Sequence, residues 1–226
     1  MCIQMLYYGG TMKISHIPEH IEQLTIMNVP EYYKLNNNHA LIVRSKAETD
    51  FWLKTHYGFQ VMNGHVFYTE TMTDFQAEVE LRMNPNSKFD QAGLFVMISE
   101  KCWLKTSLEY IPDGPSHLGA VVTNNGYSDW STQDFPTELA NEQLRFRIVR
   151  KRGDYTIYVK KIHQWEQIRI AHLMEDIGNK PIKIGFYTCS PSKNNGFETE
   201  FLEFTTEKIL MKNRILFIRN AVFICI

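Results

Sequence analysis

Phe75-Gln-Ala-Glu-Val-Glu-Leu-Arg-Met83 is the stretch of this sequence that best indicates the fold. Apolar and polar residues alternate strictly along it, so that five apolar side chains from Phe75 to Met83 would share one face. Successive side chains of a β-strand point to opposite sides of the sheet. The stretch is therefore predicted to be a strand with one buried face and one solvated face.

Shorter β-rich runs flank this strand on its N-terminal side. They cover Ala40–Arg44, Phe59–Met62 and His65–Thr69, and Asn63-Gly64 separates the last two. An Asn-Gly pair favours the type I′ turn of a tight hairpin, because that turn needs positive φ at both central residues. We therefore expect a hairpin centred on Asn63-Gly64.

The C-terminal half repeats the pattern. Leu144–Lys160 contains a Gly153-Asp154 turn between two alternating runs, which predicts a second hairpin, and Gly185–Phe204 offers two further strands around 191–196. Helical periodicity is scarce. Many short strands joined by turns favour an all-β sandwich of two antiparallel sheets over alternating βαβ units.

The length and composition fit one domain. The chain has 226 residues, of which 44% are hydrophobic and 13% aromatic, enough for a sizeable core, and no repeat or low-complexity linker divides it. We expect an N-terminal extension over 1–11, the sandwich domain over 12–207, and a C-terminal extension over 208–226.

The charge balance bears on the class of partner. Lys and Arg number 24 and Asp and Glu 25, which gives a net charge of −1. Such a chain lacks the field that would recruit nucleic acid or an anionic membrane surface, so neither partner is expected and a neutral one is favoured. The apolar C-terminal run ILFIRNAVFICI is also too short to span a bilayer.

The cysteines and the N-terminus indicate a cytoplasmic location. Cys2, Cys102, Cys189 and Cys225 are scattered, with neither a C-x-x-C pair nor the dense spacing of a small secreted domain, so we expect reduced thiols. The N-terminus has no basic leader followed by an apolar run, and the sequence has no N-x-S/T acceptor.

Histidine patterns and catalytic motifs support neither a metal site nor a cofactor. His16 and His20 have the helical spacing of metal ligands but enclose Pro18, and His56 and His65 are equally consistent with ordinary ring hydrogen bonds. G-x-S-x-G, P-loop, G-x-G-x-x-G and H-E-x-x-H motifs are absent. No metal, cofactor or catalytic residue is predicted.

Three tryptophans stand beside ionisable or hydroxyl residues, namely Trp52, Trp103 and Trp130. In Cys102–Tyr110, alternation places Trp103, Lys105, Ser107 and Glu109 on one face. Aromatic planes beside fixed polar groups suit neutral sugars, whose C–H faces stack on rings while their hydroxyls form hydrogen bonds. The same face would also fit the solvated side of an edge strand.

Two further interpretations of the polar residues stay open. Asp129 could cap its own turn by bonding nearby backbone amides. Glu109 and Asp129 are also the one attractive pair for a glycoside hydrolase, which needs two carboxyls across the scissile bond, although no acid pair shares a strand face at close spacing.

Several blocks in a fixed order carry a family resemblance. Thr49–Gly58, Gly64–Tyr68, Asp90–Leu94, Trp103–Tyr110 and Gly126–Ser131 resemble the successive signature blocks of the regulation-of-enolase protein family, and Gly185–Pro191 with Gly196-Phe197 resembles its closing block. The similarity spans roughly 14–207. Ser107 departs from the small Gly or Ala more usual there.

The resemblance implies a concanavalin A-like jelly-roll β-sandwich, the fold of many lectins and glucanases. It raises the expectation of a carbohydrate or related metabolite as ligand. We therefore expect a non-catalytic cytoplasmic binding protein with a regulatory role in sugar metabolism; the alternatives are a glycoside hydrolase or lyase using Glu109 as acid/base, and an interaction module for a glycolytic enzyme. The predicted ligand-binding residues are Trp52, Gln91, Trp103, Lys105, Glu109, Asp129 and Trp130.

Overall fold

The computed structural model describes residues 21–193 and 195–209. The predicted extension over 1–11, His16, His20 and the predicted C-terminal extension beyond Ile209 lie outside these residues. The helices in the described part are two 3-10 turns, η2 (Ile21–Gln23) and η3 (Thr137–Leu139). No helix among the described residues is long and apolar enough to cross a membrane.

Within the described residues, strands form two large sheets and one small hairpin. The first sheet has the order β1 (Thr25–Met27), β6 (His65–Thr71), β15 (Ile182–Cys189), β8 (Gln91–Ser99), β9 (Cys102–Glu109), β10 (Ser116–Asn124) and β11 (Tyr127–Phe135). The second has the order β14 (Gln164–His172), β13 (Asp154–Lys161), β12 (Gln143–Lys151), β7 (Phe75–Asn84), β16 (Glu198–Lys208), β3 (Leu41–Arg44) and β2 (Tyr32–Leu35). The hairpin pairs β4 (Phe51–Leu53) with β5 (Gln60–Met62).

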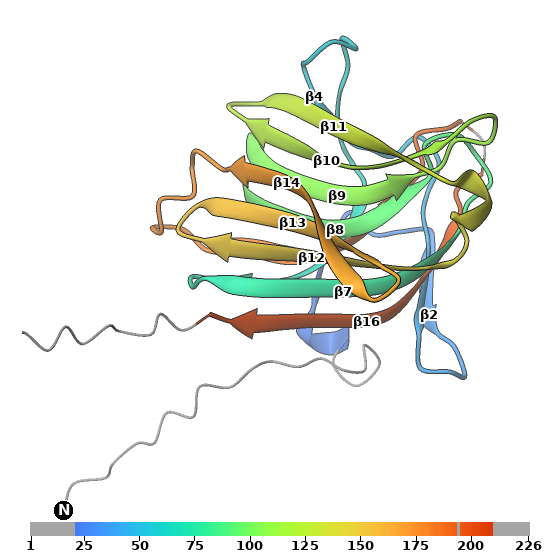
Figure 1. Ribbon diagram of the computed structural model, residues 1–226, viewed down its shortest axis with the longest axis horizontal. Coiled ribbons are helices and arrows are strands. Elements are labelled where there is room, and N and C mark those ends of the chain that lie inside the picture. Colours follow the sequence, from blue (N-terminus) through green and yellow to red (C-terminus); the bar gives the residue numbers. More distant parts are fainter. Residues whose placement is uncertain (1–20, 194, 210–226) are drawn as a thin grey trace, which may run out of the picture.

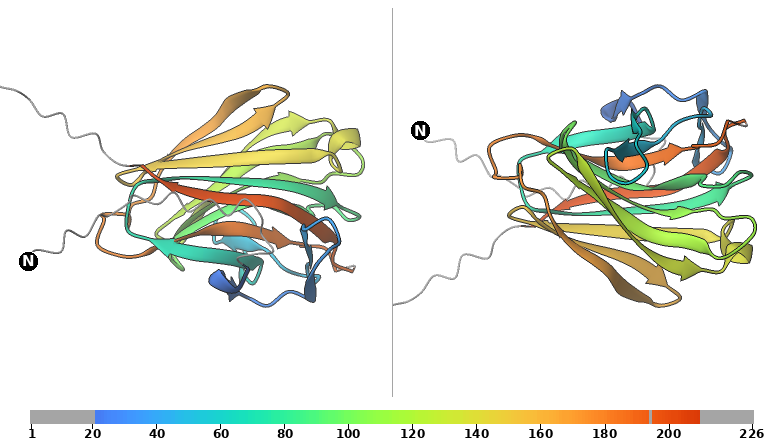
Figure 2. Two further views of the ribbon diagram at one scale, coloured as in Figure 1. Left: turned by 90° about the horizontal axis from the view of Figure 1, so that it is seen from below. Right: turned by 90° about the horizontal axis from the view of Figure 1, so that it is seen from above.

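The two large sheets pack face to face as layers of a sandwich (Figures 1 and 2). The chain changes sheet repeatedly: β6 and β8 belong to the first sheet but the intervening β7 to the second, and β15 returns to the first between β14 and β16. Neighbouring strands pair antiparallel, as in the contacts of β7 with β12 and β16. The predicted all-β sandwich of two antiparallel sheets is confirmed.

Strand β7 shows why the alternating pattern specifies this packing. The apolar residues Phe75, Ala77, Val79, Leu81 and Met83 are each at most 2% exposed and belong to the core between the sheets. Burying five such side chains stabilises the sandwich through removal of apolar surface from water. The predicted strand and its buried face are therefore confirmed.

The other face of β7 carries a network of ion pairs. Arg145 on β12 contacts Glu78 and Glu80 at 3.1 Å each, and Glu203 on β16 at 2.9 Å. Arg147 pairs with Glu78 at 2.6 Å. Charges of opposite sign thus face one another across adjacent strands, which favours this strand order.

The second predicted hairpin is confirmed, with its turn one residue earlier than expected. Strands β12 and β13 pair with Lys151 opposite Asp154, so Arg152 and Gly153 form the turn. Both have positive φ, 53° and 85°, as a type I′ turn requires.

The hairpin predicted at Asn63-Gly64 is wrong. Strand β5 pairs with β4, whereas β6 pairs with β1 and β15. The Asn63 side chain instead accepts a hydrogen bond from the Asp50 backbone N–H at 2.9 Å, and the backbone N–H groups of Asn63 and Gly64 donate to Asp50 O at 3.1 and 3.2 Å. These contacts with Asp50 fix the connection from hairpin β4–β5 to strand β6 of the first sheet, and they override the local turn preference.

Hairpin β4–β5 covers part of the first sheet on the side away from the core. Phe51, Trp52 and Leu53 form a second apolar cluster there with side chains such as Phe95 and Trp103. The loop of the hairpin projects beyond the sheet in Figure 1. Both faces of the first sheet are therefore packed, one against the second sheet and the other partly against this hairpin.

A buried charge cluster ties β12 to the segment after β14. Arg150 contacts Asp176 through two bonds of 2.7 and 2.6 Å and Asp74 at 2.8 Å, and the Tyr155 hydroxyl donates to Asp176 at 2.5 Å. The side chains of Arg150 and Asp176 are only 4% and 1% exposed. Removing one partner of such a pair leaves an uncompensated buried charge.

We expect Asp176→Ala to lower the free energy of unfolding by about 3–5 kcal/mol, because it removes two of the three hydrogen bonds of the buried Arg150 guanidinium and the acceptor of the Tyr155 hydroxyl, leaving the guanidinium only Asp74 among the described residues. Urea denaturation of the two proteins measures this difference. Glu166→Ala is the matched control: its pair with Lys161 is 41% and 46% exposed, and its loss should cost less than about 1 kcal/mol. Equal losses in both variants would contradict the assignment.

Candidate functional site

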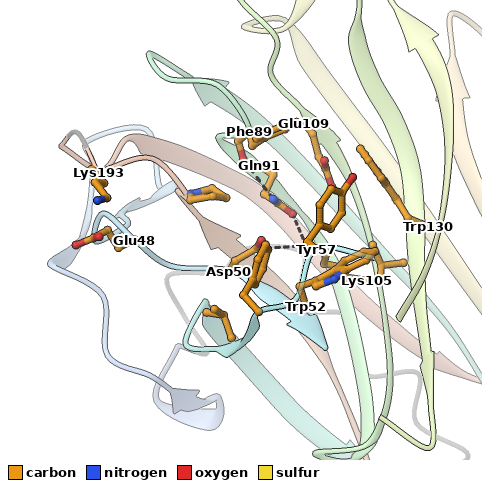
Figure 3. A pocket seen from close by; sticks show the side chains of 14 residues that line it. Glu48, Asp50, Trp52, Tyr57, Phe89, Gln91, Lys105, Glu109, Trp130 and Lys193 are labelled. Atoms are coloured by element: carbon orange, nitrogen blue, oxygen red, sulfur yellow. Dashed lines mark hydrogen bonds and ion pairs between the residues drawn. The ribbon is translucent and has the colours of Figure 1, made fainter. Parts of the chain in front are cut away.

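A pocket of about 650 Å³ lies on the first sheet, on the face away from the core and beside hairpin β4–β5. Its lining combines aromatic and aliphatic walls with a small group of polar side chains, shown in Figure 3. The lining residues are Glu48, Asp50, Trp52, Tyr57, Phe59, Val61, Phe89, Gln91, Lys105, Glu109, Val121, Trp130, Pro191 and Lys193. Its size and mixed lining are those of a small-molecule site.

Strand register places the polar and aromatic residues in rows across the sheet. One row aligns Gln91 with Glu109, and another aligns Lys105, Val121 and Trp130 on adjacent strands. The row between them carries only small residues on the central strands, Gly93, Ser107 and Gly119. The side chains of the flanking rows therefore have room above the sheet.

The two glycines of that middle row cannot be replaced by alanine without a clash. A Cβ atom at Gly93 would lie 1.8 Å from the carbonyl oxygen of Thr106, and one at Gly119 would lie 2.0 Å from that of Ser131. The close approach of neighbouring backbones thus requires glycine at both positions.

Lys105 occupies the centre of the polar group. Its Nζ donates to Asp50 Oδ1 at 3.0 Å and to Gln91 Oε1 at 2.7 Å (Figure 3). The Tyr187 hydroxyl also donates to Gln91 Oε1 at 2.9 Å, and Gln91 Nε2 donates to Phe89 O at 3.2 Å. Burial alone lowers the pKa of Lys105, but the electrostatic interactions with Asp50, Cys189 and Glu109 and the hydrogen bond to Asp50 together outweigh it, so the pKa of Lys105 is raised. Lys105 therefore stays protonated.

Glu109 is the chemically unusual residue of the pocket. It is 7% exposed and lies beside Lys105, yet no residue in the described part of the chain donates a hydrogen bond to its carboxyl group. Burial raises the pKa of Glu109 to about 7; Lys105 opposes this rise, and Asp50 adds to it. Near neutral pH the group is therefore balanced between carboxylic acid and carboxylate, able to donate or accept a hydrogen bond.

His117 stands opposite Glu109 on β10. Its ring contacts that of Trp130 edge to face, with centroids 5.5 Å apart, and its buried Nδ1 has no hydrogen-bond partner among the described residues. The ring supports the Trp130 wall of the pocket from the side.

The remaining walls are aromatic and come largely from hairpin β4–β5. The Trp52 indole N–H donates to Thr55 O at 2.8 Å, which fixes the ring. Tyr57 packs edge to face on Trp52 at 5.2 Å and stacks with Phe59 at 5.9 Å. The hairpin therefore supplies one aromatic side of the pocket, and Trp130 on β11 another.

The structure brings five of the seven predicted ligand-binding residues into this pocket: Trp52, Gln91, Lys105, Glu109 and Trp130. Trp103 shares their face of the sheet, but it is fully buried beneath the hairpin, where its ring contacts Phe51 and Phe95. It does not line the pocket.

Asp129 also lies outside the pocket. It is on the opposite face of β11 from Trp130, with a side chain 74% exposed, and it pairs with Arg169 of β14 at 2.5 Å. Arg169 also donates to Ser131 Oγ at 2.8 Å and to Ala120 O at 3.1 Å. These contacts join the edge strands of the two sheets, so a place for Asp129 in a glycosidase pair with Glu109 is contradicted by the geometry.

The histidine pair has separate roles. His65 is buried, with Nδ1 2.7 Å from Asn28 O and Nε2 accepting from the Lys46 backbone N–H at 3.0 Å, and burial lowers its pKa. His56 contacts the Tyr57 ring. No group of three His, Cys, Asp or Glu side chains suited to a metal ion occurs within residues 21–193 and 195–209.

Asp50, Tyr57 and Phe59 are the main pocket residues that the sequence argument missed. Asp50 directly precedes the Phe51-Trp52 pair in the first of the signature blocks, Thr49–Gly58, and Tyr57 lies near the end of the same block. That concentration of acid and aromatic residues was an available signal, although nothing local shows that Asp50 meets Lys105.

Fold and site together define a β-sandwich domain with an aromatic-walled, polar-floored pocket on one sheet. Residues 26–209 match the model of DUF1349, a family described as proteins of unknown function. The chain belongs to this family. The resemblance to the regulation-of-enolase family predicted from the sequence blocks is also confirmed, as the relatives show.

The chain is 33% identical over 164 residues to Regulation of enolase protein 1 of Saccharomyces cerevisiae, covering 72% of this chain and 79% of that protein. A solved structure of a functionally unknown protein from Saccharomyces cerevisiae has 30% identity and a TM-score of 0.74, covering 84% of this chain and 98% of the other. The carbohydrate binding module CBM66 from Bacillus subtilis has a TM-score of 0.51 at 12% identity, covering 81% and 95%. This last likeness concerns the fold alone.

The raised pKa of Glu109 predicts how stability depends on pH. The folded chain holds this proton up to about pH 7, whereas an ordinary glutamate releases it near 4.5. The resulting stability is fully present below pH 4.5 and is lost as the pH rises through 7, in total about 3 kcal/mol. Glu109→Gln should therefore lose less stability than the natural protein over this interval.

Urea unfolding of both proteins between pH 5 and 8.5 checks this expectation. The other titrating groups are common to both, so the difference between the two curves isolates Glu109. Two parallel pH profiles would show that the Glu109 carboxyl is not destabilised by burial.

Proposed function

We propose that the protein is a non-catalytic binding protein for a neutral saccharide or a closely related polyhydroxylated metabolite. The observation that carries this proposal is the pocket floor, where a buried carboxyl without a hydrogen bond from the described residues adjoins a fixed ammonium group beneath aromatic walls. The Glu109 oxygens open onto the pocket, where a ligand hydroxyl can form hydrogen bonds with them.

The charge of the pocket favours a neutral ligand. Asp50 already neutralises Lys105, and Glu48 and Lys193 offset each other among the lining residues. Hydroxyl groups can both donate and accept, which suits a carboxyl that is half ionised near pH 7. The C–H faces of a sugar ring can meanwhile pack on Trp130 and Tyr57.

We place this binding in the cytoplasm. Cys102 and Cys189, the cysteines of the described residues, are buried free thiols. Reduced thiols are the usual state there, whereas secreted domains generally pair them.

Trp130→Ala should weaken saccharide binding by about tenfold or more, because the ring supplies stacking area that alanine lacks. Isothermal titration calorimetry against D-glucose, D-xylose, L-arabinose, D-fructose and their disaccharides measures the affinity. Gln133→Ala, at an exposed position of the same strand that does not line the pocket, is the matched control and should bind normally. Absence of heat with every sugar, or equal losses in both variants, would sink the proposal.

A glycoside hydrolase or lyase is the second candidate, and one observation favours it. Glu109 has a pKa of about 7, while nearby Asp50 is held in an ion pair with Lys105. A carboxyl with a raised pKa beside a second carboxyl that is held in an ion pair resembles the acid pair of a glycoside hydrolase. Asp50, not Asp129, would be the partner of Glu109.

Chromogenic 4-nitrophenyl glycosides distinguish the two candidates. We expect release of nitrophenol no faster than in buffer. Turnover that disappears in both Glu109→Gln and Asp50→Asn would instead establish the enzyme.

We further propose a regulatory link to enolase, supported by the name of the yeast relative. Calorimetry of the purified protein with yeast enolase, with and without the saccharide that binds best, measures this. A complex whose affinity changes with the sugar is the expected result, and no binding under either condition would remove the proposal.

A further inference from the structure

We propose that the pocket binds an oligosaccharide of at least two linked sugar rings rather than a single sugar. The inner ring would contact Glu109, Lys105 and Gln91, and the next ring would stack on the side chains of Tyr57 and Phe59. This inference rests on the proposed saccharide-binding function and specifies its ligand.

The inner position is defined by the hydrogen-bonding capacity that the described residues leave unused. Lys105 donates two of its three N–H groups, to Asp50 and Gln91. Gln91 donates one of its two amide N–H groups, to the Phe89 carbonyl oxygen. With the carboxyl group of Glu109, which accepts no hydrogen bond from the described part of the chain, these groups offer two donors and an acceptor within one small area. Adjacent hydroxyls of one sugar ring match that set.

The outer position is defined by aromatic rings that run from the interior into solvent. Trp52 is 6% exposed, Tyr57 is 50% exposed and Phe59 is 42% exposed, and all three line the pocket. Tyr57 contacts Trp52 and stacks nearly parallel on Phe59, with 22° between the rings. Two large rings left half exposed and stacked at a pocket mouth present apolar faces that a ligand can cover.

The loop that carries Tyr57 and Phe59 has a tightly turned backbone. Lys54 and His56 adopt positive φ, 57° and 62°, and Gly58 follows at 71°. Tight backbone bonds of 2.7 Å join Thr55 N–H to Leu53 O and Tyr57 N–H to Thr55 O. Non-glycine residues adopt such φ values at a cost, which is typical of loops shaped for binding.

The pocket, with a volume of about 650 Å³, also has room for more than one sugar ring. The inner polar groups lie on strands β8 and β9, whereas Tyr57 and Phe59 lie on the loop between β4 and β5. A second linked ring would extend from the strands toward this loop and remove apolar surface of Tyr57 and Phe59 from water.

The test compares the affinities for sugars of increasing chain length. One series is D-xylose, xylobiose and xylotriose, and the other is D-glucose, cellobiose and cellotriose. Calorimetry of the natural protein should give a disaccharide affinity about tenfold above that of the monosaccharide in at least one series. In Tyr57→Ala/Phe59→Ala this ratio should fall below about threefold, whereas Tyr57→Phe, which keeps the ring, should retain it.

Tyr33→Ala is the matched control, since Tyr33 is 45% exposed on β2 in the second sheet, and it should leave the ratio unchanged. Equal affinity for mono- and disaccharides in the natural protein overturns the inference while the saccharide-binding proposal stands. No binding of any sugar in either series overturns the inference, and the wider sugar panel then decides the proposed function separately. A ratio preserved in a folded double variant, checked by its melting temperature, also overturns it.

Discussion

The ion pair between Lys105 and Asp50 is the contact on which the pocket depends. Lys105 lies in the middle of the first sheet, whereas Asp50 directly precedes the strand that covers it, so their 3.0 Å contact fastens hairpin β4–β5 to the sheet. Loss of either partner would leave a buried charge without its counter-charge. Gln91 and Tyr187 extend the same network through shared hydrogen bonds. The floor of the pocket is therefore set before any ligand arrives, which lowers the entropy cost of binding.

The same ion pair explains the state of Glu109. Burial makes ionisation of this carboxyl unfavourable, and the ammonium group that would offset it is already bonded to Asp50. The two carboxyl groups, Asp50 and Glu109, therefore share one ammonium group, that of Lys105. Glu109 is therefore neutral or charged depending on its surroundings. It lines a pocket with aromatic walls, in which the other charged side chains balance one another. Such a group distinguishes ligands by their hydrogen-bonding pattern rather than by their charge.

Local patterns in the sequence predicted most of the fold and part of the site. Period-2 alternation identified β7 and its buried face, and the same rule put Trp103, Lys105 and Glu109 on one side of β9. It could not show that hairpin β4–β5 covers Trp103 and leaves Glu109 open, because that depends on chain segments about fifty residues away. Asp50 was missed for the same reason. The Asn63-Gly64 prediction failed where a long-range contact outweighed a strong turn preference.

Arg169 gives the sandwich a property that neither sheet has alone. It projects from β14 of the second sheet and holds three groups on β10 and β11 of the first, directly behind the strand that presents Trp130. The strand that carries the Trp130 wall is thus tied to the opposite layer by the neighbours of Trp130 on both sides, Asp129 and Ser131. The position of the Trp130 wall therefore depends on residues of both sheets, so that a substitution at Arg169, which does not line the pocket, acts on the site through β11.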